Sequence, residues 1–581
     1  MILSPSSAAP ARSLRALCLI ALGSLLFAAT AHAQWKTTTY TLKGGWNSIY
    51  LHGDASYATL ETIFASQTAV EEVWRWNPNP TQVGFTASPL IPSAGTAEWS
   101  TWVRGGSANS LGELVGQTAY LVKCSGTTSN TYSVTIPQKV MPPSASWVRN
   151  GANLMGFPSK LNSSYPTLAA YFATFPAAIA SNVKIYKYVG GDLGPGNPLQ
   201  VYSTSSEKLD RNQAYWFDSE VVGNFYAPVE ISTSSSQGLD FARGGSVITV
   251  RLRNRSSAVS TVTITPLNSA DAPGDQETVA AGVPLIRRTL DATSGAWSET
   301  ALSANASFPV VVGPQSTVEL SFGINRGSAA MTSAPADALF ASLLRFTDSA
   351  GLYDISLPVT ARKASLAGLW IGEASVANVV SQAAASAGTT TAKPYPLRVL
   401  IHVDAAGQAR LLSQVYLGEL AAGSAAAGLC LQENQLKAGT KASALRFSVA
   451  HLPLDRVIAG TGAFALGSSL ECTIQIPYND PTNPFLHEYH PDHDNKDARF
   501  EDFALPVGVT ATTAKLSDGV EAPAITRACK FQFASSGGVG FGSSLVSGSY
   551  SESFTGLHQK TLQVSGTFEL QRVSEIATLT Q

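Results

Sequence analysis

The 581-residue sequence has few charged residues, and it has no long apolar run after its first 33 residues. Charged residues make up only 13% of the chain and the formal net charge is −2. Nucleic-acid binding depends on clustered Lys and Arg that neutralise phosphates. A transmembrane helix needs roughly 18 or more apolar residues in succession. We therefore expect no nucleic-acid partner and no transmembrane segment in the mature chain.

Cysteine is also scarce, with five in the whole sequence. Cys18 lies in the N-terminal segment considered below, and Cys124 stands alone near the front of the chain. One disulfide is feasible among Cys430, Cys472 and Cys529, and the sequence does not choose the pair. No C-x-x-C spacing occurs, so a redox or zinc-ribbon role has no support.

Common catalytic signatures are missing as well. The sequence contains no G-x-S-x-G nucleophile elbow, no P-loop and no dinucleotide-binding fingerprint. The glycine-rich stretch at 190–196 lacks the lysine and the helix that a phosphate-binding loop needs. These absences favour a protein that is not an enzyme.

The N-terminal segment has the order of parts that defines a secretory signal peptide. Arg12 and Arg15 supply positive charge, residues 16–29 form a short apolar core, and residues 31–33 are Ala-His-Ala before the expected cut. We predict a signal peptide at residues 1–33 and a secreted mature chain, extracellular or periplasmic, that begins at Gln34.

An internal repeat follows the signal peptide. The first copy has matching segments at 45–51, 59–64, 73–76 and 117–122, and the second has them at 151–157, 167–172, 185–188 and 213–217. Alternation places Trp74 with Trp76, and Tyr186 with Tyr188, on one face of a strand. We predict two tandem β-rich modules with a short helix each, at residues 34–138 and 139–232.

The repeat resembles a secreted bacterial module with a G-W-N-type first strand and an A-Y-W-type last strand. Here these segments begin at Gly45 and near Gln213. Modules of this kind occur in tandem in large exported proteins, so the resemblance implies export and modularity. It implies no reaction.

A different pattern begins near Gly238. Short alternating or apolar segments, separated by turn signals, predict the strands of an immunoglobulin-like β-sandwich at residues 238–363. These segments are 246–253, 259–265, 308–312, 317–322 and 352–359.

The remainder, residues 364–581, predicts a C-terminal antiparallel β barrel or sandwich. A hairpin is indicated where residues 397–403 and 409–415 flank a turn at 404–407. The complete fold class is therefore mainly β, with tandem modules, an immunoglobulin-like sandwich and this C-terminal domain.

A cluster of metal-ligating residues lies within residues 487–497 of that domain. Imidazole nitrogens suit zinc, whereas carboxylate oxygens suit calcium, so the cluster is a candidate site for either metal. The alternative is a polar turn, because Asp, Asn and Pro also favour turns. The spacing matches neither H-E-x-x-H nor an EF-hand. The candidate ligands in this loop are His487, His490, Asp492, His493, Asp494 and Asp497.

This region resembles an uncharacterised C-terminal domain of exported bacterial proteins, which has an N-P-F-x-H-x-Y-H-P-D-H-D-N loop and a G-L-H-x-K segment near its end. The second motif begins at Gly556 and contains His558. The resemblance implies domain identity and no activity. It makes His558 the candidate distant partner of the loop.

Tryptophans are concentrated in the repeat and could offer flat faces to sugar rings. Most stand at matching strand positions in both copies, as a shared core requires. Trp99 and Trp102 lie in a polar stretch of the first copy only, so they are the candidate ligand-binding residues.

Together these patterns predict an exported, non-catalytic binding, adhesion or scaffold protein whose partner is an extracellular protein or a polysaccharide. One alternative is a metal-dependent hydrolase that uses the loop at 487–497 with zinc or calcium. The other is a polysaccharide-binding accessory protein with exposed tryptophans.

Overall fold

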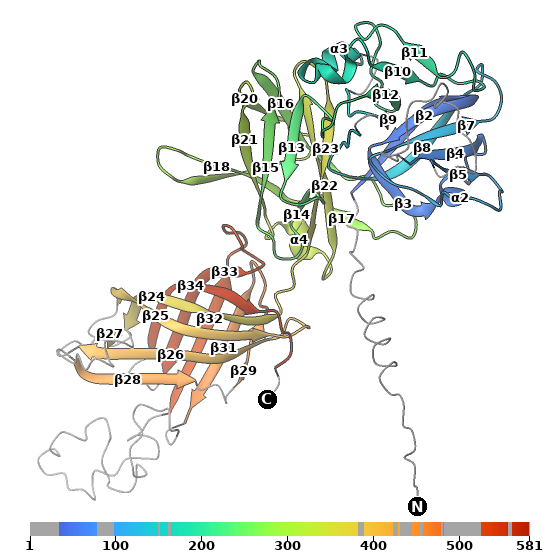
Figure 1. Ribbon diagram of the computed structural model, residues 1–581. Helices are drawn as coiled ribbons and strands as arrows, with labels where there is room; N and C mark the ends of the chain where they lie inside the picture. The colour runs from blue at the N-terminus through green and yellow to red at the C-terminus, as the bar shows by residue number, and fades with distance from the viewer. Residues whose placement is uncertain are drawn as a thin grey trace, which may run out of the picture.

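The computed structural model describes residues 34–77, 98–148, 151–160, 164–381, 388–421, 428–429, 444–452, 457–477, 480, 524–555 and 561–579. The fold is mainly β, as predicted, with several mostly antiparallel sheets and a barrel-like sheet near the C-terminus. Figure 1 shows the barrel-like sheet, in yellow to red, below a larger group of sheets in blue to yellow-green. Within the described ranges, no helix combines the length and apolar character that crossing a bilayer requires.

The first module, residues 35–140, consists of two sheets with strand orders β1-β8-β3-β6 and β2-β7-β4-β5. One apolar core lies between them and includes Tyr40, Ile49, Trp102 and Tyr120. Its elements are β1 (Trp35–Lys43), β2 (Gly45–Leu51), β3 (Gly53–Thr59), α2 (Leu60–Ile63), β4 (Val70–Trp76), β5 (Trp99–Val103), β6 (Glu113–Leu114), β7 (Thr118–Cys124) and β8 (Thr131–Val140).

The second module, residues 151–219, has one sheet with the order β11-β10-β12-β9. Its main elements are β9 (Gly151–Met155), α3 (Leu168–Tyr171), β10 (Lys184–Lys187), β11 (Leu199–Val201) and β12 (Tyr215–Ser219). Asn47 and Asn153, at matching positions of the two copies, make the same contacts. Each side-chain amide accepts from and donates to the backbone of the preceding turn, at Lys43 and at Val148 respectively.

Aromatic side chains and backbone hydrogen bonds join the two modules. The Trp76 and Trp216 ring centroids are 5.2 Å apart, and those of Trp99 and Trp216 are 6.3 Å apart. The backbone N–H of Trp46 donates to the carbonyl oxygen of Gly191 at 2.8 Å. This approach requires Gly45, because a Cβ there would lie 2.3 Å from the same oxygen.

The sandwich pairs a sheet of order β13-β15-β21-β18-β19 with one of order β14-β23-β22-β16-β20. Its core is continuous with that of the second module, since one buried cluster includes Phe217 and Phe225 together with Val262 and Leu357. All five strands predicted here are present. The strands are β13 (Val229–Thr233), β14 (Leu239–Asp240), β15 (Val247–Asn254), β16 (Ser260–Asn268), β17 (Val279–Ala281), β18 (Leu285–Leu290), β19 (Trp297–Ala301), β20 (Phe308–Val312), β21 (Thr317–Ile324), β22 (Leu339–Asp348) and β23 (Asp354–Arg362), with helix α4 (Ala329–Ser333) before β22.

The barrel-like sheet is nearly closed. The short strand β29 pairs with β26, and β30, two residues later, pairs with β31, so this segment joins the two sides of the sheet. The predicted hairpin at 404–407 is present between β25 and β26. The strands are β24 (Gly368–Ser381), β25 (Gly388–Val403), β26 (Ala409–Ala421), β27 (Gly428–Leu429), β28 (Ala444–Leu452), β29 (Ile458–Ala459), β30 (Thr461–Gly462), β31 (Ser469–Ile476), β32 (Ile525–Phe533), β33 (Leu545–Thr555) and β34 (Leu562–Ser574).

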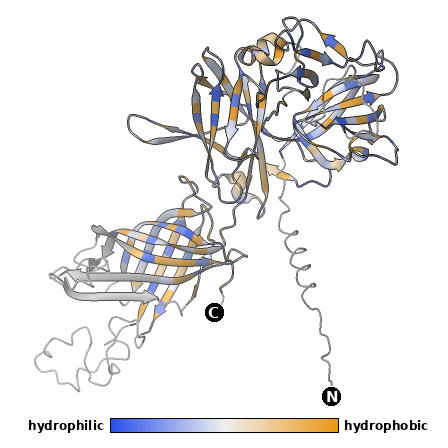
Figure 2. Ribbon diagram, viewed as in Figure 1, coloured by the Kyte–Doolittle hydropathy of each residue, from blue (hydrophilic) through white to orange (hydrophobic). Residues whose placement is uncertain are grey.

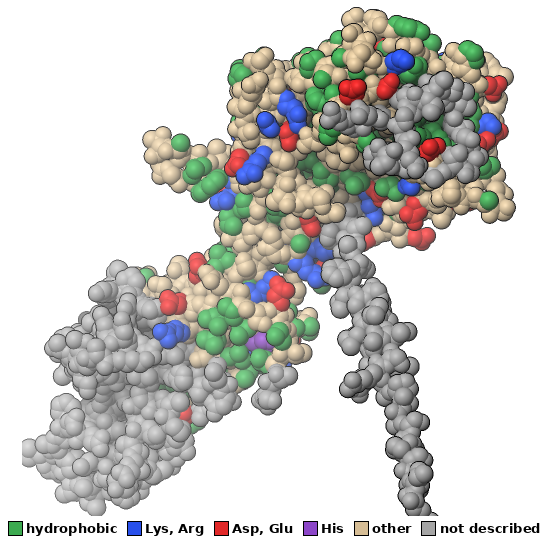
Figure 3. Space-filling model, in the orientation of Figure 1, with side chains coloured by type: hydrophobic (Ala, Val, Ile, Leu, Met, Phe, Trp, Pro, Cys, Tyr) green, Lys and Arg blue, Asp and Glu red, His purple; other side chains and the backbone are tan. Residues whose placement is uncertain are grey.

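Alternation along these strands determines which side chains face the interior. In β31, Leu470, Cys472, Ile474 and Ile476 are buried and the residues between them are more exposed. Figure 2 shows the resulting stripes of hydrophobic and hydrophilic residues across the barrel-like sheet. On the face of the protein seen in Figure 3, basic and acidic side chains are interspersed.

Candidate functional site

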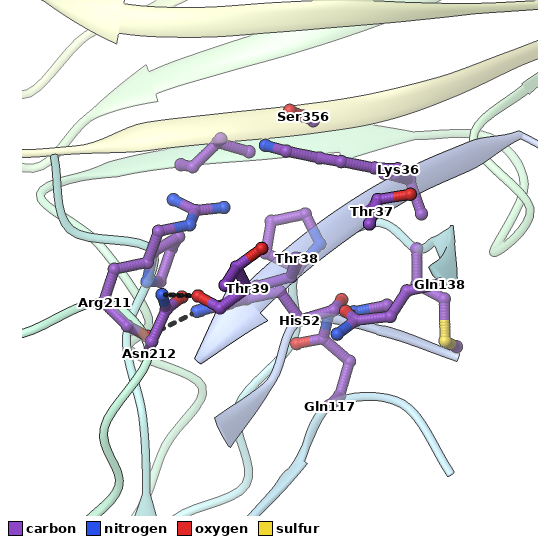
Figure 4. Close-up of a pocket in the computed structure, with 16 residues that line it drawn as sticks. Lys36, Thr37, Thr38, Thr39, His52, Gln117, Gln138, Arg211, Asn212 and Ser356 are labelled. Atoms are coloured by element: carbon purple, nitrogen blue, oxygen red, sulfur yellow. Dashed lines mark hydrogen bonds between the residues drawn. The ribbon is translucent and has the colours of Figure 1, made fainter. Parts of the chain in front are cut away.

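A cavity of about 170 Å³ lies where the first module, the second module and the sandwich meet, and we call it the junction pocket. Its walls come from β1, β8 and the turns before β3 and β7 in the first module, from the segment before β12 in the second, and from β23 in the sandwich (Figure 4). The polar residues labelled there are Lys36, Thr37, Thr38, Thr39, His52, Gln117, Gln138, Arg211, Asn212 and Ser356.

Strand alternation explains why β1 contributes to the pocket. Tyr40 and Leu42 point into the core of the first module. Thr38 and Lys36 occupy the same face of the strand two and four residues before Tyr40, since side chains alternate with a period of two. The core face of β1 therefore continues into the junction pocket, where polar residues replace apolar ones.

Arg211 ties the second module to the sandwich. Its side chain is only 6% exposed. Its Nη1 donates to the carbonyl oxygen of Ser159 at 3.2 Å and to the carbonyl oxygen of Asp354. Next to Arg211, the amide of Asn212 donates to the Thr39 carbonyl oxygen at 3.2 Å, which fixes the same segment against β1 (Figure 4).

Among the described residues, the carboxylate that acts on Lys36 and Arg211 is Asp354, and it is already paired. Asp354 is fully buried, and Arg345 donates to its two oxygens from Nε at 3.0 Å and from Nη2 at 2.6 Å. Burial alone would raise the pKa of Asp354, but the hydrogen bonds from Arg345 and the charges of Arg211 and Lys36 outweigh it and lower the pKa. Asp354 is therefore ionised and satisfied by Arg345.

Lys36 and Arg211 consequently form an excess of positive charge. In the described part of the chain, the Lys36 amine makes no hydrogen bond or ion pair. Burial, and then repulsion from Arg211, lower the pKa of Lys36 to about 8, with Asp354 opposing and Arg345 adding to the decrease. Burial also lowers the pKa of Arg211, which stays a cation because a guanidinium does not deprotonate in proteins.

Neutral side chains complete the wall. The His52 Nε2 atom lies 2.8 Å from the Arg211 carbonyl oxygen. Burial, and to a smaller extent the charge of Arg211, holds the pKa of His52 well below 6.5. The His52 ring is therefore neutral and donates from Nε2. Gln117 donates to the His52 carbonyl oxygen at 2.5 Å, while Gln138 accepts from the Gly53 N–H at 3.0 Å. These amides are fixed by backbone contacts.

This arrangement suits recognition of a ligand by charge and hydrogen bonds. The cations supply attraction, and the hydroxyls of Thr38 and Ser356 add groups that both donate and accept.

The candidate metal ligands lie outside the described residues. These are His487, His490, Asp492, His493, Asp494, Asp497 and His558. Metal binding by this loop stays a prediction. Across the described ranges, no group of three or more His, Cys, Asp or Glu side chains is placed to hold a metal ion.

Trp99 and Trp102 are not in an open polar stretch, in contrast to our expectation. Trp99 is 6% exposed and packs against Trp74, Trp76 and Trp216 between the modules. Trp102 is 1% exposed, packs against Phe64 and donates from its indole nitrogen to Glu61 at 2.5 Å. Polar neighbours in sequence misled the expectation, because both faces of β5 are covered: Trp102 lies in the core of the first module, and Trp99 lies on the opposite face, in the aromatic cluster between the modules. Their positions give no support to an open sugar-binding face.

The junction pocket was not predicted from the sequence. Lys36, His52 and Arg211 form no motif, because they belong to different units and meet only through packing. One signal was available in retrospect, since Lys36 occupies the inward face of a strand whose other inward residues are Thr38, Tyr40 and Leu42. A lysine on a core face suggests a site or a partner.

No protein-family model matches the chain, and no curated protein matches it. Among solved structures, the CupB2 chaperone of Pseudomonas aeruginosa is 10% identical, with 31% of this chain and 93% of that chain covered and a TM-score of 0.15. The E. coli chaperone DraB is 10% identical, with 35% and 96% covered and a TM-score of 0.14. A Bacteroides ovatus protein of unknown function is 8% identical, with 60% and 95% covered and a TM-score of 0.17. Scores this low support no inference about this chain.

Proposed function

We propose that this chain is an exported, non-catalytic binding protein and that the junction pocket is its ligand site. The observation that carries the proposal is the construction of the pocket from three units at once. Arg211 contacts the sandwich through Asp354, and Asn212 contacts the first module through Thr39. Interlocking contacts of this kind hold a pocket in its binding shape before a ligand arrives, which lowers the entropic cost of binding.

The same rigidity supports a scaffold role for the front half of the chain. The core of the second module is continuous with that of the sandwich, and the two modules share the aromatic cluster around Trp216. Units joined through buried apolar surface move together. An adhesion or scaffold protein benefits from such a rigid platform.

Export is supported by the N-terminal pattern, in which positive charge, an apolar core and small residues occur in order. N-terminal sequencing of the protein recovered from a secreting bacterial host tests this part. We expect the processed chain to begin at Gln34. Recovery of an unprocessed chain from the cytoplasm would contradict export.

Ligand binding is tested by thermal denaturation of the chain from Gln34 onward against neutral sugars, acidic sugars and short peptides. At least one of these ligand classes should raise the midpoint temperature of unfolding, by an amount that grows with ligand concentration. Thr38→Phe fills the pocket wall and should abolish the shift, whereas Thr41→Phe, at an exposed position of the same strand, should preserve it. A shift that survives in a folded Thr38→Phe variant, or no shift with any class, would overturn the proposal.

The metal-dependent hydrolase remains an alternative that rests on the loop at 487–497. Its test is the metal content of the purified chain beside a His490→Ala, His493→Ala double variant. Near-stoichiometric zinc or calcium that is lost in the variant would favour it over pure binding.

A further inference from the structure

The junction pocket contains the positive charges of Lys36 and Arg211, and no side chain among the described residues neutralises them. Lys36 reaches the cavity from β1, and Arg211 reaches it from the segment before β12 (Figure 4). The nearby carboxylate, Asp354, is held by Arg345 through two nitrogens. Among the described residues, three cations, Lys36, Arg211 and Arg345, therefore surround one carboxylate, Asp354.

Such an arrangement is unfavourable for the empty protein. A partly buried ammonium loses hydration, and a neighbouring guanidinium of the same sign adds repulsion. Buried cations of this kind are normally paired with an anion. Arg211 also has unused donors, since only its Nη1 makes hydrogen bonds within the described residues.

We propose that the junction pocket binds a small oxyanion, a carboxylate, phosphate or sulfate group, between the ammonium of Lys36 and the guanidinium of Arg211. This inference rests on the proposed function and names the ligand class of the same pocket. The oxyanion replaces the missing counter-charge, and the remaining donors of Arg211 suit the planar edge of a carboxylate or the face of a phosphate.

The size of the pocket and its other lining residues limit which molecule can present the oxyanion group. A cavity of about 170 Å³ admits a small molecule or one residue of a larger one, and not a folded partner. The hydroxyls of Thr38 and Ser356 are available to hydrogen-bond hydroxyl groups of a ligand. The carrier is therefore an acidic sugar residue or an inorganic oxyanion, and these two sources are separated by experiment.

Isothermal titration at pH 7 and low salt tests the inference with four probes: D-glucuronate, inorganic phosphate, sulfate and neutral D-glucose. Lys36→Met removes the charge and keeps most of the volume. Lys43→Met makes the same change at an exposed position of the same strand. We expect at least one oxyanion to bind the unaltered chain and Lys43→Met alike, and to lose more than tenfold in affinity in Lys36→Met, as for a lost charge-assisted hydrogen bond. Lys36→Arg should restore part of the binding.

The outcomes separate this inference from the proposed function. If glucuronate binds more tightly than phosphate and sulfate, the ligand is an acidic sugar. If phosphate or sulfate binds more tightly, the ligand is an inorganic oxyanion. Either result supports the inference. Equal oxyanion affinity in Lys36→Met and the unaltered chain means an adventitious ion only and overturns it. Binding of neutral glucose alone, if lost in Thr38→Phe, overturns the inference and keeps the proposed function. If no ligand binds in either thermal denaturation or isothermal titration, both the inference and the proposed function are overturned.

Discussion

Cys472 on β31 and Cys529 on β32 lie directly opposite one another in the antiparallel register, and both side chains face the interior of the barrel-like sheet. The Cys529 thiol donates to the Cys472 carbonyl oxygen at 3.2 Å. Opposite residues in such a pair have Cα atoms about 4.5 or 5.5 Å apart, which is within the range that a disulfide spans. Cys430 lies outside the described residues, so Cys472 and Cys529 are the pair that the structure places together among the three cysteines that the sequence left open.

We predict that an oxidising compartment joins Cys472 to Cys529. Exchange with an oxidised dithiol or glutathione disulfide forms the bond and releases two thiols of the oxidant, so the chain loses two free thiols. Non-reducing peptide mapping should find the two cysteines in one cross-linked species, and reduction should lower the stability of the barrel-like sheet by up to about 4 kcal/mol through loop entropy. Cys124→Ala serves as a control that leaves the cross-link intact. A cross-link that contains Cys430 instead would contradict the prediction.

A buried ion pair gives the second prediction. Arg527 Nε donates to Glu552 Oε1 at 2.7 Å, and both side chains are fully buried within the barrel-like sheet. Glu552→Ala leaves the Arg527 charge buried without this partner and should lower the free energy of unfolding by about 3 to 5 kcal/mol. Chemical denaturation measures the change. Glu319→Ala is the matched control, because its ion pair with Arg251 is exposed and should contribute at most about 1 kcal/mol. If the two variants lost the same free energy of unfolding, burial would not determine how much an ion pair contributes to stability.

Several strands with one buried face were predicted from the sequence. In β15 and β16 buried residues alternate with more exposed ones, and both strands were expected from that pattern. The strand β22 was not among those expected, and its first six residues are all buried and show no alternation. The neighbouring β23 is buried throughout as well, yet it was expected as an apolar segment. Strands β16 and β23 place β22 inside the sheet, which the sequence of β22 itself does not reveal.

The candidate sites were harder to predict for a different reason. A cluster such as residues 487–497 is visible because its members are adjacent in sequence. The junction pocket is not visible in this way, since Lys36 and Arg211 come together only after two modules and the sandwich have packed. Tryptophan exposure also depends on packing, and Trp99 is covered by Trp216 of the other module.

Gly45 gives a third prediction, about how the two modules are joined. Its φ is +84°, and a Cβ at this position would lie 2.3 Å from the Gly191 carbonyl oxygen, a backbone atom that cannot rotate away. Gly45→Ala should therefore combine backbone strain with loss of the Trp46–Gly191 hydrogen bond and cost about 3 kcal/mol or more. Gly105→Ala has a similar φ of +68° with open space around it and should cost only about 1 kcal/mol. Urea denaturation followed by tryptophan fluorescence compares the two, and equal losses would mean that the contact between the modules contributes nothing beyond the strain.

Lys36 gives the last prediction, which concerns stability as a function of pH. The groups that face its ammonium are Arg211, Arg345 and the paired carboxylate of Asp354, with neutral His52 in the same wall. The pKa of Lys36 is about 8 in the folded protein and near its ordinary value of 10.5 in the unfolded chain. Between these pH values the unfolded chain binds more protons, so this group makes stability rise with pH across that window.

Lys36→Met should therefore raise the free energy of unfolding at pH 7 by about 2 kcal/mol in the absence of an oxyanion, since a neutral side chain of similar length avoids the loss of hydration and the repulsion from Arg211. The advantage should shrink as the pH rises from 8 toward 10.5, because the unaltered chain then folds with Lys36 neutral. Urea denaturation at several pH values measures both effects, with Lys43→Met as the control for removing a lysine from β1. If Lys36→Met were no more stable than Lys43→Met at pH 7, the ammonium of Lys36 would already be compensated, and the argument for a missing counter-charge in the junction pocket would fail with it.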